Sequence, residues 1–169
     1  YIKCQLSFFY KYVCDIDEPE ETEEGDVDAR TFGNIFHTIA EDIYTPVIER
    51  GGKVTPDLFD TYLKNPAMLK QLIDKAFCEN LFKMTDSSKP MPKLNGTQLI
   101  NYNVITTYVR NLLSYDKSNT PFDILALEED VSIPVTVHSA EDFQTTIGGR
   151  IDRLDSKDGH MRVIDYKTG

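Results

Sequence analysis

The stretch from Ile147 to Gly169, which reads IGGRIDRLDSKDGHMRVIDYKTG, constrains the fold of this chain more than any other. Two runs with the composition of β-strands flank Asp158-Gly159. Asp-Gly between such runs is a strong hairpin signal, because a type I′ turn needs a positive φ at both of its central residues. A two-residue turn here sets a register in which Asp152 lies directly opposite Asp165. The sequence therefore predicts an antiparallel hairpin with two facing carboxylates.

Two like charges on neighbouring strands repel, because the Cβ atoms of a cross-strand pair lie roughly 5 Å apart. A divalent cation between Asp152 and Asp165 would remove this repulsion and create a metal site. Lys167 shares the face of Asp165, since side chains two residues apart in a strand point the same way. The alternative is a surface hairpin with solvated charges. Apolar neighbours instead favour strands that are buried on both faces; they are Ile147, Ile151, Val163 and Ile164.

Upstream of the hairpin, the sequence predicts helices first and strands afterwards, which implies an α/β (α+β) fold with a mostly antiparallel sheet. The clearest helix spans residues 29–50, where one apolar stripe at helical spacing consists of Phe32, Phe36, Ile39, Ile43 and Val47. Further helices are expected at 2–14, 56–63, 66–84 and 97–115, with a loop at 85–95. Strands are expected at 122–128, 131–137, 145–155 and 160–168.

Gly33, His37 and Glu41 share a second face of the 29–50 helix, because they are spaced four residues apart. Glycine inside a helix is costly relative to alanine, so Gly33 should mark a close approach to other backbone. A lone histidine is commonly a hydrogen-bonded structural residue, and a metal ligand is the alternative. Glu41 either orients His37 or is a solvated helix charge.

The charged residues near the hairpin are expected on two different faces of the sheet. Arg150 shares the face of Asp152 and is placed to contact phosphate or a carboxylate, whereas Arg153 points the other way and is expected to be structural. Glu128 and Glu129 are expected to end a strand in a solvated acidic turn. His138 and His160 are expected to be structural.

Four spaced elements together resemble the PD-(D/E)XK nuclease superfamily, in its RecB/AddB branch. Gly33 to His37 matches G-x-x-x-H, Gly149 to Asp155 matches G-x-x-D-R-x-D, and Asp165 to Thr168 matches D-Y-K-T. Cys4 to Val13 looks like the C-P-x-x-F-Y-x-x-Y segment that opens such domains, with Gln5 in place of proline. The resemblance covers roughly residues 1–45 and 120–169.

The resemblance implies a restriction-endonuclease-like core, with a central mixed sheet flanked by helices. We expect one nuclease-like domain over residues 1–169, as a fragment of a longer protein that is truncated before the Q-x-x-x-Y helix of the family. The implied activity is metal-dependent hydrolysis of DNA phosphodiester bonds. Such a domain would be the exonuclease part of a helicase–nuclease or a related repair or recombination protein.

The same resemblance assigns roles to individual residues. It implies Mg²⁺ or Mn²⁺ held by His37, Asp152, Asp165 and the backbone carbonyl of Tyr166. The implied catalytic residues are Asp152, Asp165 and Lys167, with the lysine positioning a hydroxide or stabilising the transition state. The implied supporting residues are Gly33, Glu41 and Arg150. The alternative is a degenerate, non-catalytic domain that scaffolds a repair complex, but no implied ligand is missing.

Cys4 stands where some AddB-like nucleases place one iron–sulfur ligand, whose three companions lie beyond the D-Y-K motif. A cluster is therefore compatible only with the full-length protein, and a small buried apolar residue is the alternative reading of Cys4. The set of Cys4, Cys14 and Cys78 has no C-x-x-C spacing and indicates no disulfide framework, so we expect a reducing cytoplasm.

The formal net charge is −10, which weighs against tight nucleic-acid binding by this domain alone. Much of the excess lies between Asp15 and Asp28, an acidic stretch without Lys or Arg that we expect to be a solvated loop. The expected partners are DNA, as single-stranded ends, and the remaining domains or a helicase subunit of the parent protein. No apolar run is long enough to predict a membrane span.

Overall fold

The computed structural model describes residues 4–14, 16, 27–84, 86, 89–138 and 142–168. The helical elements are α1 (Gln5–Phe8), the π-helical η1 (Phe9–Val13), α2 (Ala29–Ile48), α3 (Pro56–Leu63), α4 (Pro66–Asn80) and α5 (Gly96–Asn119). The strands are β1 (Lys53–Val54), β2 (Phe122–Val137), β3 (Phe143–Lys157) and β4 (His160–Ile164). The predicted α/β (α+β) class, with a curled sheet and flanking helices, is confirmed.

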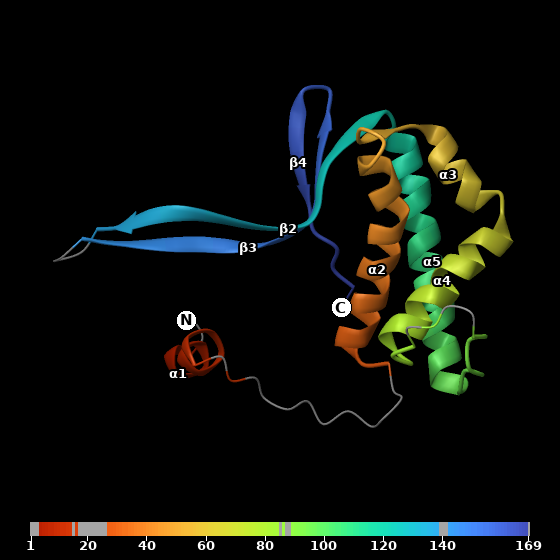
Figure 1. Ribbon diagram of the computed structural model, residues 1–169, viewed down its shortest axis with the longest axis horizontal. Helices are drawn as coiled ribbons and strands as arrows, with labels where there is room; N and C mark the ends of the chain where they lie inside the picture. Colours follow the sequence, from red (N-terminus) through yellow and green to blue (C-terminus); the bar gives the residue numbers. More distant parts are fainter. Residues whose placement is uncertain are drawn as a thin grey trace.

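The four strands form one sheet in the order β1-β2-β3-β4, and every described pairing is antiparallel. This agrees with the mostly antiparallel sheet predicted from the element order, rather than with the mixed sheet that the resemblance implied. The near halves of β2 and β3 curl beside the helices, while their far halves project as a two-stranded arm (Figure 1). The sheet therefore meets the helices along its near half, where α2 contacts β1 and β2.

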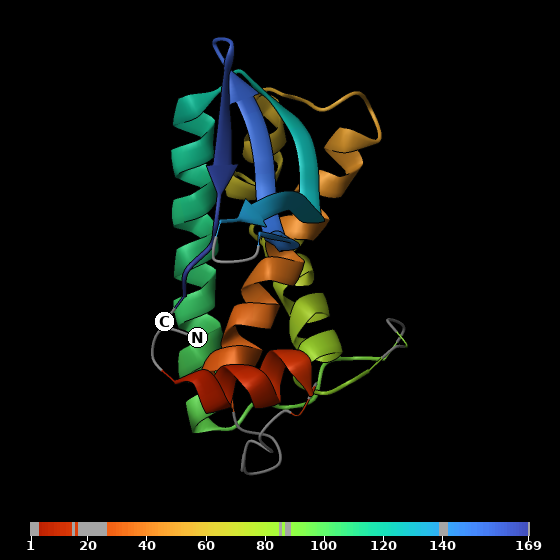
Figure 2. The ribbon, with the colours of Figure 1, turned by 90° about the vertical axis from the view of Figure 1, so that its left-hand side faces the viewer.

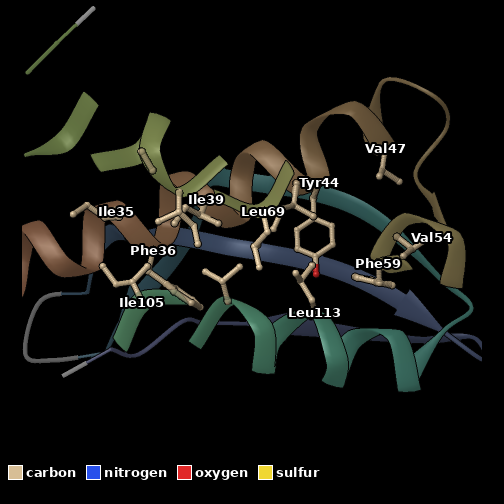
Figure 3. Packing of buried hydrophobic residues seen from close by; sticks show 14 of the residues in the cluster. Ile35, Phe36, Ile39, Tyr44, Val47, Val54, Phe59, Leu69, Ile105 and Leu113 are labelled. Carbon is tan, nitrogen blue, oxygen red and sulfur yellow. The ribbon is translucent and has the colours of Figure 1, made fainter. Parts of the chain in front are cut away.

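The helices gather on one side of the near half of the sheet, with α2 and α5 beside it (Figures 1 and 2). Between them lies the hydrophobic core, in which the stripe predicted on α2 is buried from Phe36 to Val47. Figure 3 shows side chains of α2, α4 and α5 converging there, among them Ile39, Leu69 and Ile105. Truncating one such core side chain to alanine costs about 2–5 kcal/mol.

Local signals explain how α2 carries His37 to the sheet. The helix begins after Asp28, whose carboxylate accepts a 2.6 Å hydrogen bond from the amide of Thr31. It ends before Gly51, whose φ of +99° is a backbone conformation that glycine adopts without a steric penalty. The helix expected at 29–50 is thus confirmed from Ala29 to Ile48.

The β3–β4 hairpin has the predicted turn and register. Asp158 and Gly159 both have positive φ, at 52° and 80°, as a type I′ turn requires. Lys157 pairs with His160, and the register continues as far as Arg153 opposite Ile164. One further step places Asp165 opposite Asp152. The strand expected over 160–168 stops at Ile164, so Asp165 lies just beyond the last paired residue.

The expectation that the hairpin strands are buried on both faces is wrong. Ile147 is 60% exposed and Val163 is 64% exposed, while Ile151 and Ile164 are half-buried. The physical reason is that helices of the described chain cover only one face of the sheet (Figure 2). Apolar composition alone did not distinguish a covered face from an open one.

Four other expectations need correction. The predicted strands at 122–128 and 131–137 form one continuous β2, with an irregularity in register between Ile124 and Ala126. The helix expected over 66–84 ends at Asn80. Cys4 is exposed, so it is not the small buried residue that was the alternative expectation. The helix predicted at 2–14 runs from Gln5 to Val13, and its apolar side chains are exposed.

The acidic stretch predicted as a solvated loop falls largely on residues 15 and 17–26, which lie outside the described residues. The same holds for 85, 87 and 88 of the predicted loop at 85–95. Among the described helices, none combines the length and the apolarity needed to cross a lipid bilayer.

Candidate metal and catalytic site

Two carboxylates face each other on neighbouring strands, and a third lies just beyond the end of β4. The pairs Leu127–Arg153 and Glu129–Ile151 bracket Glu128 on β2 and Asp152 on β3, so these two residues face each other. Continuing the β3–β4 register brings Asp165 to the other side of Asp152. Carboxylates at adjacent cross-strand positions repel, so the group requires a positive partner.

His37 on α2 points toward these carboxylates. Its Nδ1 atom lies 3.2 Å from Oε1 of Glu128 and 3.7 Å from Oδ1 of Asp152. Its Nε2 atom lies 3.3 Å from the backbone carbonyl oxygen of Tyr166. Both ring nitrogens therefore face acceptors, whereas a neutral imidazole can donate from only one of them. A metal ion held at one ring nitrogen would leave the other N–H to donate to its acceptor.

One ligand atom each from His37, Glu128 and Asp152 lies within 4.8 Å of the others. Two carboxylates and an imidazole at this spacing fit a divalent cation such as Mg²⁺ or Mn²⁺. Asp152 is nearly buried, and its second oxygen accepts a 2.6 Å hydrogen bond from the amide of Tyr166. That bond fixes the carboxylate and leaves Oδ1 directed at the cluster.

Glu128 is the residue that the sequence reasoning missed. It was expected in a solvated acidic turn, but it is half-buried within β2 and accepts hydrogen bonds from His37 and from Nε of Arg150, the latter at 2.9 Å. Its φ of +50° is rare for a residue with a side chain, and such strain is concentrated at functional sites. No local signal marked this position, because the register irregularity between Ile124 and Ala126 interrupts the period-two alternation that would relate Glu128 to the buried Phe122 and Ile124.

Asp165 and Lys167 form a separate pair beside the cluster. Nζ of Lys167 lies 3.0 Å and 2.9 Å from the two oxygens of Asp165, whose side chain is 53% exposed. The hydrogen bond from Lys167 holds the pKa of the Asp165 carboxyl below its usual range, and the same bond raises the pKa of Lys167. The structure thus gathers His37 and Asp152 with Glu128, and places Asp165 with Lys167 alongside.

The supporting residues line a groove of about 540 Å³ that begins at the cluster and follows α2. A Cβ atom on Gly33 would lie 3.4 Å from Oγ1 of Thr168, so the predicted close approach exists, against a side chain rather than backbone. Glu41 lines the groove, but the hydrogen-bond partners of His37 in the described chain are Glu128 and Tyr166. Glu128 therefore takes the orienting role considered for Glu41.

Behind the site, Arg153 is buried, as expected of a structural residue. Its guanidinium donates to both oxygens of Asp116 on α5, at 2.6 Å and 3.2 Å. It also pairs with buried Asp155, which accepts a 2.6 Å bond from Arg162. Asp116 was not predicted, although it follows the buried face of α5 at helical spacing after Leu113.

A larger cavity, of about 770 Å³, lies between α4 and the segment after it, and its lining includes Lys70, Cys78 and Met91. None of the candidate catalytic or metal-binding residues lines it. Burial raises the pKa of the Cys78 thiol, which keeps this residue a poor nucleophile. Cavity size alone therefore does not locate the chemistry of this chain.

Comparison with known proteins agrees with this geometry. The family model described as the PD-(D/E)XK nuclease superfamily matches residues 1–169, including the middle of the chain that the sequence motifs left unmatched. Neither the curated proteins nor the solved structures contain a match to the chain. Nucleases of this superfamily use divalent metals, and the cluster of His37, Glu128 and Asp152 is a possible metal site of that kind. The chain belongs to the PD-(D/E)XK nuclease superfamily.

Proposed function

We propose that this domain is a Mg²⁺- or Mn²⁺-dependent deoxyribonuclease of the RecB/AddB-like branch. The observation that carries the proposal is the convergence of His37, Glu128 and Asp152 within 4.8 Å, beside the paired Asp165 and Lys167. Hard oxygen ligands and one imidazole suit these ions. The proposed ligands are His37, Asp152, Asp165 and the Tyr166 carbonyl, with Glu128 added.

A bound cation would lower the pKa of a ligated water and offset negative charge on the phosphate. The chain's own residues then perform the remaining work. Asp152 and Asp165 are the proposed catalytic carboxylates, and Asp165 also orients Lys167. Because its pKa is raised, Lys167 stays protonated, so it acts as a donor to water or phosphate rather than as a base.

The groove along α2 suggests where a DNA strand would lie. Arg30 and Arg150 both line it, together with Glu128 and Asp152 of the cluster. Guanidinium groups bind phosphate through charge-assisted hydrogen bonds, so these two residues are suited to hold the backbone next to the scissile bond. The net charge of −10 implies that neighbouring domains supply most of the remaining affinity.

The family context suggests an exonuclease acting on single-stranded ends in a cytoplasmic repair or recombination assembly. The partners would be the other domains of the parent protein or a helicase subunit. Cys4 is exposed, which is compatible with a role as one ligand of an iron–sulfur cluster completed elsewhere in the full-length protein. These assignments rest on family analogy.

The experiment compares end-labelled single-stranded DNA, duplex DNA and RNA of one sequence, each with Mg²⁺, Mn²⁺ or EDTA. We expect metal-dependent degradation of DNA by the wild-type parent protein and none by Asp152→Asn. His138→Ala is the control, because His138 pairs with Asp142 at 3.0 Å far from the cluster. Metal binding without hydrolysis of any substrate would instead identify a non-catalytic scaffold, and cleavage in EDTA would contradict the proposal.

A further inference from the structure

We infer that Tyr166 is a positioning residue whose ring sets the path of residues 165–168 beside the carboxylate cluster. The inference rests on the proposed function for the role of that cluster. Its evidence is the packing of the chain's own side chains. The hydroxyl group of Tyr166 has no part in this role.

The ring of Tyr166 is enclosed by groups from α2 and β3. Its centroid lies 5.7 Å from that of Phe36 and 5.8 Å from that of His37, both nearly edge-on at 78° and 82°. On another side, the guanidinium carbon of Arg153 lies 5.8 Å from the ring centroid. Edge-on aromatic contacts and a cation over a ring are both attractive geometries. One side chain thus joins the core to the site.

The backbone of Tyr166 serves the site directly. Strand pairing ends at Ile164, and the following segment runs beside α2 (Figure 1). Within that segment the amide of Tyr166 donates to Asp152 at 2.6 Å, and its carbonyl faces His37 at 3.3 Å. Because no ladder holds these residues, the ring is the element that keeps both backbone groups in place. It also determines where Asp165 and Lys167 fall.

Arg153 secures the ring from behind. Its side chain is 2% exposed, and its guanidinium carbon lies 5.0 Å and 5.4 Å from the ring centroids of Tyr44 and Phe122. Its ion pair with Asp116 ties this aromatic cage to α5. The cage is therefore fixed by two helices and two strands, and a fixed cage gives Tyr166 one position.

The hydroxyl oxygen of Tyr166 is buried without a hydrogen-bond partner in the described chain. An unsatisfied buried hydroxyl contributes a penalty rather than a benefit. The roles of the ring and of the hydroxyl group can therefore be tested separately by substitution. Phenylalanine at this position keeps the ring without the hydroxyl group, so it should preserve the positioning role.

The positioning role of Tyr166 is tested with three variants of the whole chain: Tyr166→Phe, Tyr166→Leu and Tyr108→Leu. Tyr108 is the matched control, because its ring also packs edge-on against Phe36, whereas in the described chain the ring that packs against His37 is that of Tyr166. The first readout needs no metal. A 2.6 Å bond to a carboxylate moves the residue-166 amide proton downfield in NMR spectra. We expect Tyr166→Phe and Tyr108→Leu to keep that shift and Tyr166→Leu to lose it.

The second readout is Mn²⁺ affinity by calorimetry. Loss of groups that orient metal ligands weakens binding by roughly 10- to 100-fold, so Tyr166→Leu should bind at least ~10-fold more weakly, with the other two variants within about twofold of wild type. Retention of both the amide shift and the affinity by Tyr166→Leu would overturn the inference. Equal losses in Tyr166→Phe would overturn it too, by assigning the role to the hydroxyl.

Thermal unfolding checks that each variant is folded. If Tyr166→Leu unfolds, Phe36→Leu removes one wall of the ring's site while keeping Tyr166, and an unmoved amide resonance in that variant would refute the inference. A wild-type protein that binds no Mn²⁺ would contradict the proposed function. The metal-free amide shift would still decide whether Tyr166 positions the segment.

Discussion

The Nδ1 atom of His37 lies 3.2 Å from Oε1 of Glu128, although 91 residues separate them along the chain. Helix α2 and strand β2 meet at this contact, and Asp152 on β3 completes the cluster. The candidate site is therefore made by the packing of a helix against a sheet. Its integrity can be tested at each contributing element.

The first prediction concerns His37. His37→Ala should weaken Mn²⁺ binding by more than the roughly 10- to 100-fold that loss of an orienting group costs, because a proposed ligand is removed. The same change at His138 should leave the affinity unchanged, since His138 is exposed and pairs only with Asp142 in the described chain. Isothermal titration with Mn²⁺ measures both. Equal affinity of the two variants would remove His37 from the ligand set.

Substitutions of Lys167 and of Asp165 should affect catalysis and metal binding differently. Lys167→Ala should abolish DNA digestion while leaving Mn²⁺ affinity largely intact, because the lysine is a donor and not a ligand. Asp165→Ala should impair both, because it deletes a carboxylate beside Asp152. A labelled-DNA assay run in parallel with the titration makes the comparison. Undiminished digestion by Lys167→Ala would show that the assignment of this lysine is wrong.

Glu128 should show a conflict between stability and function. Its positive φ disfavours any residue with a Cβ, so Glu128→Gly should be more stable than Glu128→Ala by about 1 kcal/mol. Both variants should lose Mn²⁺ affinity equally, since both delete the carboxylate. Denaturant unfolding measures the difference in the free energy of unfolding. A less stable glycine variant would mean that the strand relaxes without the side chain.

The buried pair of Asp116 and Arg153 should matter far more than a surface pair. Asp116→Asn leaves a buried guanidinium without its main counter-charge and should cost about 3 kcal/mol. Lys70→Ala breaks the exposed pair with Asp74 and should cost less than about 1 kcal/mol. Chemical denaturation of the two variants gives both values. Similar losses would mean that Asp155 alone compensates Arg153.

Low pH should destabilise the N-terminus of α2 by protonating the carboxylate of Asp28. The hydrogen bond from Thr31 lowers the pKa of the Asp28 carboxyl. Because the folded value lies below the unfolded value, this contribution is present above about pH 4 and is lost as pH falls through the folded pKa. Asp28→Asn retains a cap but cannot titrate. The melting temperature of the wild type should exceed that of the variant at pH 7 and converge with it at low pH.

Local rules explain what could be predicted. The Asp158-Gly159 turn needs positive φ at both residues, and this alone determines the hairpin register, which runs from Lys157 opposite His160 to Arg153 opposite Ile164. Helical spacing likewise identified the buried stripe of α2 and placed His37 on a different face of that helix. The hairpin register and the helix faces both depend on residues that are close in the chain, so both can be predicted from the sequence.

Tertiary packing decided the rest. Whether Glu128 reached solvent or His37 depended on a strand irregularity and on the position of a helix 91 residues away, neither of which has a local signal. The open face of the sheet, with Val163 exposed, likewise reflects which side the helices cover. The sequence by itself determined the hairpin, the amphipathic helices and the identity of most candidate residues. Only the three-dimensional fold decided which carboxylates share one site, because that depends on the distances at which distant elements pack.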